Sequence, residues 1–167
     1  MIVINKETVA DIWHFLNARY QCSLPFPDVN IILVPMKDWG KIGFFNCKPT
    51  EDNGNEYENE EDRKMNGKPY ATGAVLYVRR GIKGEENTIF GKFEFTILLC
   101  KNYIDPSKLA CFQELGINKN HHQLSYVWSI MHEFTHMLEE KLNRQLITAQ
   151  EDAFQFADYI LKWSVRA

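Results

Sequence analysis

The amino-acid sequence predicts a fold that contains both α-helices and β-strands. Apolar residues recur at helical spacing near both ends of the chain, whereas its middle contains short runs rich in β-branched and aromatic residues. The chain has 167 residues, of which 45% are hydrophobic and 25% are charged. Because this length is sufficient for one hydrophobic core, we expect a single domain over residues 1–167.

The first elements follow from local signals. Residues 6–20 place apolar side chains on one helical face, and Asn5 is a suitable cap for that helix. Residues 29–34, a compact apolar run between two prolines, predict a buried strand, and residues 42–46 predict a second short strand. Residues 49–69 are acidic and nearly free of apolar side chains, so we expect an exposed acidic loop there. A solvated insertion is favoured over a flap that recognises a basic partner.

Two further strands are expected at residues 70–78 and 93–100, joined by a charged, glycine-containing hairpin loop. The second of these runs alternates apolar and polar residues at its beginning, which predicts one partly wet face there. Asp105 followed by a proline is typical of a helix start, and Gly116 of the end of that short helix.

The following segment, residues 129–138, reads SIMHEFTHML and contains His132, Glu133 and His136 in the pattern H-E-x-x-H. Residues four apart lie on the same face of a helix, so both imidazoles can bind one ion. Zinc binds neutral histidine nitrogens, and the adjacent glutamate can act as general base for a water molecule. Apolar residues surround most of this helix, which indicates that it is buried. The competing interpretation is two surface histidines with an unrelated glutamate between them.

A catalytic zinc site of this kind needs a third protein ligand. Apolar residues at helical spacing between Ala149 and Trp163 predict a last, amphipathic helix that also carries acidic residues. Asp152 falls at the edge of the apolar face of that helix, whereas Glu151 and Asp158 fall on the opposite, solvent-facing side. Thr148 and Glu151 have the spacing of a capping box, which gives Glu151 another role. We therefore predict His132, His136 and Asp152 as metal ligands, with Glu151 as the alternate. Otherwise Asp152 is a first-turn carboxylate that the helix dipole favours.

Charge and composition restrict the other function classes. The net charge of −3 and the scattered basic residues argue against a nucleic-acid partner. No apolar run is long enough to cross a bilayer, and the first residues lack the layout of a secretion signal, so we expect a cytoplasmic protein. The four cysteines have no C-x-x-C spacing and are expected to be free. These are Cys22, Cys47, Cys100 and Cys111.

The two halves of the predicted site resemble those of a known family. His132 to His136 carry H-E-x-x-H, and residues 152–157 read D-A-F-Q-F-A. This combination is similar to the zincin metallopeptidases of the gluzincin type, and more closely to the ImmA/IrrE-like minimal metallopeptidases, whose later helix reads E-A-N-x-F-A. The glutamate ligand of that family falls on Asp152, and Phe154 stands where the family has asparagine. The resemblance covers about residues 132–160.

The resemblance implies a small α+β, zincin-like domain in which a small mixed sheet packs on the H-E-x-x-H helix and a ligand-bearing helix follows. It implies a zinc-dependent endopeptidase that hydrolyses a cytoplasmic protein or peptide substrate, with Zn²⁺ as cofactor and Glu133 as general base. The strand at residues 93–100 is expected to border the cleft, where its outer edge could pair with an extended peptide. The alternative is a catalytically silent zincin-like binding or regulatory protein of a mobile element.

Overall fold

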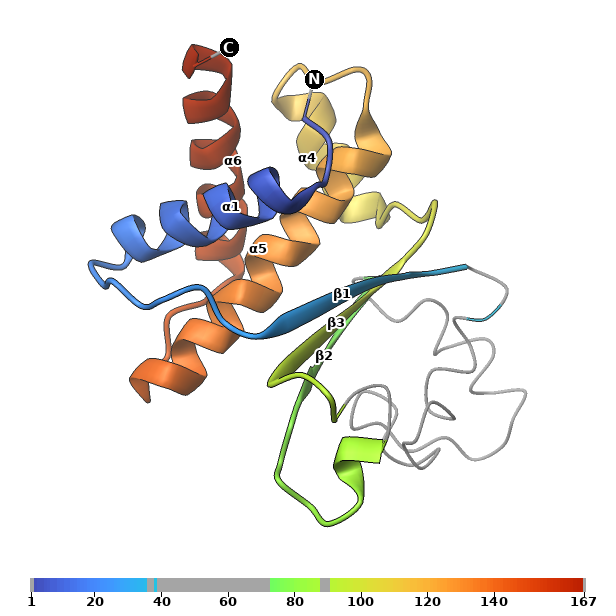
Figure 1. The fold of residues 1–167 in the computed structure, drawn as a ribbon. Coiled ribbons are helices and arrows are strands. Elements are labelled where there is room, and N and C mark those ends of the chain that lie inside the picture. Colours follow the sequence, from blue (N-terminus) through green and yellow to red (C-terminus); the bar gives the residue numbers. More distant parts are fainter. Residues whose placement is uncertain (1, 36–37, 39–72, 88–90, 167) are drawn as a thin grey trace. The chain divides into compact units, whose positions relative to one another are not determined.

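A computed structural model of the chain describes all residues except 1, 36–37, 39–72, 88–90 and 167 (Figure 1). The described part contains four α-helices and a three-stranded mixed sheet, which confirms the predicted mixture of helices and strands. The chain divides into two compact units, Met1–Phe26 with Pro106–Ala167, and Pro27–Asp105. The expectation of one domain stays a prediction, and the expected strand at 42–46 and acidic loop at 49–69 lie outside the described residues.

The first unit is helical. Its helices are α1 (Lys6–Arg19), α4 (Pro106–Glu114), α5 (His121–Leu142) and α6 (Ala149–Arg166). The long helix α5 contacts each of the other three, and α1 also contacts α6 (Figure 1). The H-E-x-x-H motif therefore lies on the helix around which this unit is built. Among the described residues, every helix is too short or too polar to cross a lipid bilayer.

The helix ends follow the local sequence signals. Asn5 Oδ1 accepts a hydrogen bond from the Thr8 amide at 2.9 Å, which satisfies one free donor at the start of α1. α4 is followed by Gly116 at φ +74°, a left-handed conformation that glycine adopts without steric cost. Asn143 ends α5 in the left-handed region at φ 51°, as its residue type predicts.

Aromatic side chains fix α5 against its neighbours. The rings of Trp13 on α1 and Phe134 on α5 meet edge to face, with centroids 5.3 Å apart. Elsewhere on α5, the ring of Trp128 stacks on that of Phe156 of α6 with centroids 4.6 Å apart, and the ring of Phe112 of α4 lies 5.6 Å from the Phe156 ring. Such pairs stabilise a fold beyond the area they bury. The position of α6 relative to α5 is therefore set by packing next to the motif.

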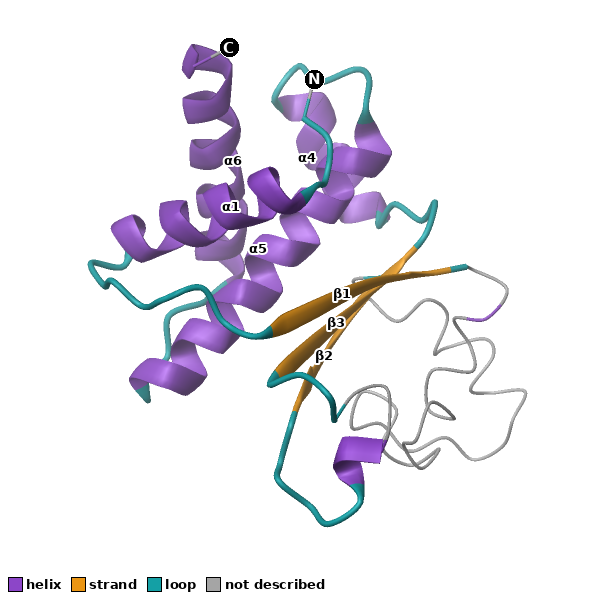
Figure 2. Cartoon of the chain, in the orientation of Figure 1, coloured by secondary structure: helices purple, strands orange, loops and turns teal. Residues whose placement is uncertain are grey.

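The second unit contains β1 (Val29–Val34), β2 (Ala74–Val78), the 3₁₀ helix η3 (Glu85–Asn87) and β3 (Phe95–Cys100). The strand order is β1-β3-β2, with β1 parallel and β2 antiparallel to β3 (Figure 2). The predicted hairpin between the second and third of these strands is confirmed, with η3 in its connection.

The place of β3 in this sheet corrects two expectations. Both edges of β3 are hydrogen-bonded, one to β1 and one to β2, so it is not the strand with an outer edge open to a peptide. All six of its residues are buried, so the predicted partly wet face does not extend into the strand. β1 has the predicted bounds but is not buried, since Leu33 is 45% exposed and only Val34 is buried. An apolar run alone does not distinguish a central from an edge strand.

Candidate metal centre

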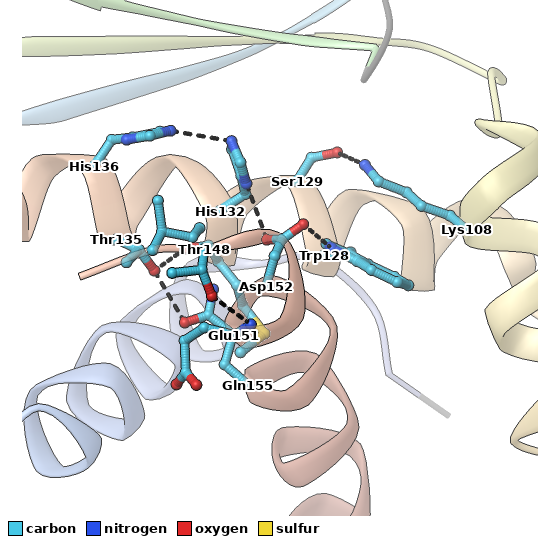
Figure 3. A network of polar contacts seen from close by, with 12 residues as sticks. Lys108, Trp128, Ser129, His132, Thr135, His136, Thr148, Glu151, Asp152 and Gln155 are labelled. Atoms are coloured by element: carbon cyan, nitrogen blue, oxygen red, sulfur yellow. Dashed lines mark hydrogen bonds and ion pairs between the residues drawn. The ribbon is translucent and has the colours of Figure 1, made fainter. Parts of the chain in front are cut away.

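Two histidines face each other on α5. His132 and His136 are one helical turn apart, and their Nε2 atoms approach to 3.1 Å (Figure 3). The two rings lie nearly perpendicular, with centroids 4.6 Å apart. The helix alone brings them to one face, because residues four apart in sequence stack along the axis. The structure thus brings together both predicted histidine ligands.

The Nδ1 atom of each ring is hydrogen-bonded to a carboxylate. His132 Nδ1 lies 2.9 Å from Asp152 Oδ1, and His136 Nδ1 lies 2.6 Å from Glu139 Oε1. A carboxylate only accepts hydrogen bonds, so each Nδ1 carries a proton, and a ring in its neutral form presents a lone pair at Nε2. Two lone pairs 3.1 Å apart repel each other unless a proton or a cation lies between them. Carboxylates hydrogen-bonded to the second ring nitrogen are typical of metal-binding histidines.

The spacing of the two nitrogens fits zinc. Zinc–nitrogen bonds of about 2.0–2.1 Å in tetrahedral geometry place two bound nitrogens about 3.3 Å apart. The observed separation of 3.1 Å between the Nε2 atoms of His132 and His136 is close to that value. These two imidazoles therefore suit two positions of one zinc ion without a change in the backbone.

A proton competes with a metal ion for the space between the Nε2 atoms of His132 and His136. Burial lowers the pKa of His132, but the hydrogen bond with Asp152 and the negative charges of Glu133 and Asp152 outweigh it, so this pKa lies above its ordinary value. Metal binding at this ring must therefore release a proton when the ring is charged.

Asp152 lies on the Nδ1 side of His132. Its Oδ1 accepts from that ring, and its Oδ2 accepts from Trp128 Nε1 at 3.0 Å (Figure 3). Burial raises the pKa of Asp152, but these two hydrogen bonds and the charges of His132 and Lys108 lower it more, which keeps the carboxylate ionised. In this arrangement Asp152 orients His132, and its role as third ligand stays a prediction. Within the described residues, no three His, Cys, Asp or Glu side chains converge on a common point where they could hold a metal ion.

Glu151, the alternate ligand, has other partners. Its Oε1 accepts from Arg19 Nε at 2.7 Å and lies 3.3 Å from the Tyr20 hydroxyl, both at the end of α1. Its backbone amide donates to Thr148 Oγ1 at 3.1 Å, which confirms the predicted helix cap on the threonine side. The expectation that Glu151 faces solvent is wrong, because α1 covers that side of α6 and supplies a cation. Asp158, 56% exposed, pairs with the same arginine at 2.5 Å.

Glu133, the predicted general base, is buried, with 6% of its surface exposed. Burial raises its pKa above the ordinary value, and the charge of Lys108, together with that of the two histidines when they are protonated, acts against this shift. A carboxyl group with a raised pKa takes up and returns a proton more readily near neutral pH than an ordinary glutamate. The structure thus shows a buried glutamate with a raised pKa beside His132 on α5, and its role as general base stays a prediction.

Glu139 belongs to this site although we did not predict it. One oxygen contacts His136, and the other accepts the backbone amides of Leu146 at 2.7 Å and Ile147 at 3.0 Å. Burial raises the pKa of Glu139, but these hydrogen bonds lower it more, so the side chain is a carboxylate. The only sequence signal is the spacing of three residues between His136 and Glu139, which places both on one helix face.

Lys108 of α4 is the second residue that sequence reasoning missed. Its side chain is buried, and Nζ donates to Ser129 Oγ at 2.7 Å (Figure 3). Ser129 precedes His132, Glu133 and His136 by three, four and seven residues, so all four lie on one face of α5. The ammonium group is therefore at the N-terminal end of the face that carries the motif. A single lysine in a short amphipathic helix carries no signal of this position.

A comparison of the chain with protein-family models, with curated proteins and with solved structures returned no match.

Proposed function

We propose that this protein is a zinc-dependent endopeptidase of the zincin type that hydrolyses a cytoplasmic protein substrate. The observation that supports the proposal is the pair of Nε2 atoms on His132 and His136, which lie 3.1 Å apart. The Nδ1 atom of each of these rings is hydrogen-bonded to a carboxylate. Two such nitrogens converge on a cation, and the adjacent Glu133 supplies the proton acceptor that peptide hydrolysis needs.

In this proposal each residue has one task. When bound, a zinc ion would activate water and polarise the scissile carbonyl. Glu133 accepts the proton of the attacking water and transfers it to the leaving amine. His132 and His136 bind the metal through Nε2, and Glu139 keeps His136 in the required tautomer and orientation. Asp152 is proposed as the third ligand with Glu151 as alternate, and of these two only Asp152 contacts a proposed metal ligand.

The test combines metal analysis with cleavage of a library of synthetic decapeptides. Wild-type protein is expected to carry about one zinc ion per chain. Glu133→Gln should keep this zinc and lose cleavage, because it removes the proton acceptor and leaves both imidazoles in place. Glu140→Gln, an exposed glutamate on the same helix, is the control and should cleave like the wild type. Cleavage at the wild-type rate by Glu133→Gln contradicts the mechanism.

A second candidate function is a zincin-like protein that binds a partner without cutting it, such as a regulatory protein of a mobile element. The engagement of both Asp152 oxygens by His132 and Trp128 favours it, because these two hydrogen bonds compete with direct binding of a metal by the same carboxylate. Zinc-loaded wild-type protein that leaves the entire peptide library intact would support this alternative over the peptidase.

A further inference from the structure

Glu139 is in contact with two separate parts of the helical unit. One carboxylate oxygen lies 2.6 Å from Nδ1 of His136, within α5. The other accepts two amides of the segment that leads into α6, those of Leu146 and Ile147. The side chain is only 16% exposed, so water competes little for these hydrogen bonds. A histidine of the proposed metal centre and the connection between two helices therefore share one carboxylate.

The backbone of Glu139 holds the same connection. Its carbonyl oxygen accepts the amide of Asn143 in the left-handed turn and the amide of Arg144 at 3.3 Å. α6 begins after Thr148, and its Asp152 carboxylate contacts His132 on α5. The connection thus begins at a residue that holds His136 and leads to a residue that holds His132.

From this closed arrangement we infer that Glu139 is a positioning residue that links metal binding at His136 to the order of residues 144–148. The inference rests on the proposed zinc site. A cation bound at Nε2 makes the Nδ1 proton more acidic, which strengthens its hydrogen bond to the carboxylate. The carboxylate is in turn fixed by the two loop amides. Because such coupling is reciprocal, zinc should order the loop, and an intact loop contact should strengthen zinc binding.

A simpler role for Glu139 is to cap the turn after α5 without any effect on the metal. The two roles differ in one measurable respect. A capping residue changes only the order of the loop, whereas a positioning residue also changes the affinity for zinc. Glu140 provides a matched control, since it is the next residue on the same helix, has the same side chain and is exposed.

The experiment measures zinc affinity, by competition with a chromophoric chelator, and amide hydrogen exchange at residues 146 and 147. Glu139→Gln is expected to weaken zinc binding by about 10- to 100-fold, the usual effect of losing a carboxylate partner of a metal-binding histidine. Glu140→Gln should bind like the wild type. Zinc should slow exchange at the two loop amides in the wild type and in Glu140→Gln, but not in Glu139→Gln.

A second variant acts from the other side of the contact. Leu146→Pro removes one of the two amide donors and leaves His136 and Glu139 in place, and circular dichroism shows whether its helices are intact. It should also weaken zinc binding. If the wild type binds zinc and Glu139→Gln binds it equally well, the link is wrong and the proposed zinc site stands. If the wild type binds no zinc, the proposed function fails and the link fails with it.

Discussion

Asp152 offers the sharpest test of the site, because both of its carboxylate oxygens have defined partners in the structure. Replacing it with alanine removes the acceptor for two donors, Trp128 Nε1 at 3.0 Å and His132 Nδ1 at 2.9 Å. Trp128 is only 6% exposed, so its N–H group is left without its acceptor in a largely dry environment. A buried donor without a partner costs free energy of unfolding.

The magnitude follows from the number and kind of hydrogen bonds. A hydrogen bond to a charged group contributes about 1.5–3 kcal/mol to stability. The Asp152 side chain is 22% exposed, so the lower end of that range applies to each bond. Two bonds then give a loss of about 3 kcal/mol in the free energy of unfolding. For a chain of this size, such a loss lowers the melting temperature by about 6–12 °C.

The assay is urea unfolding of metal-free protein, followed by circular dichroism. Asp158→Ala is the matched control, because Asp158 lies on the same helix and its ion pair with Arg19 is at the surface. An exposed pair contributes about 0–1 kcal/mol, so this variant should unfold close to the wild type. Equal stability of Asp152→Ala and Asp158→Ala would refute the assignment of Asp152 to Trp128 and His132.

The same variant separates two roles of Asp152 toward zinc. A carboxylate that only orients His132 changes zinc affinity by about 10- to 100-fold when it is removed. A direct ligand contributes a coordinate bond, so its removal should cost more than that. Zinc titration of Asp152→Ala and Glu151→Ala therefore shows whether either carboxylate binds the metal itself.

Two further predictions concern the sheet unit. The Glu85 carboxylate accepts from the Tyr77 hydroxyl and from backbone amides, which lowers its pKa below the ordinary value of 4.5. Its contribution to stability is therefore present above that value and is lost as the pH falls through the lower folded pKa. Urea unfolding should show Glu85→Gln less stable than the wild type at pH 7, and this difference should shrink as the pH falls below 4.5. Gly73 has φ +69°, and a Cβ there would lie 2.8 Å from Tyr103 Cδ1. Gly73→Ala should thus lower the free energy of unfolding by about 1–2 kcal/mol through backbone strain and by about 1–3 kcal/mol more through the clash. Gly81 has φ +73° and open space around it, so Gly81→Ala should show only the backbone loss when both variants are compared by thermal unfolding.

Much of the secondary structure could be predicted because its signals are local. The start of α1 at Asn5, the end of α5 at Asn143 and the bounds of β1 depend on residues within one or two turns of each other. The predicted helix cap at Thr148 depends on a residue only three positions away. Such contacts are fixed by backbone geometry and side-chain type, so sequence spacing is sufficient to find them.

Strand order could not be predicted in the same way. The sheet places β3 between β1 and β2, and the parallel pair joins residues more than sixty positions apart, such as Val29 and Phe95. An apolar run has the same appearance in a central and in an edge strand, because both bury apolar side chains. The assignment of a free edge to β3 therefore failed for a reason that lies outside the strand itself.

The sequence by itself determined that His132, Glu133 and His136 share one face of a helix, because that follows from the helical repeat alone. Only the tertiary structure decided which acids stand beside them. In that structure Glu151 is hydrogen-bonded to Arg19, and Asp152 to Trp128 and His132. Glu139 is hydrogen-bonded to His136 and to the loop before α6. The physical reason is that a carboxylate on a helix has several donors within reach, and the packing of neighbouring helices decides which of them it meets.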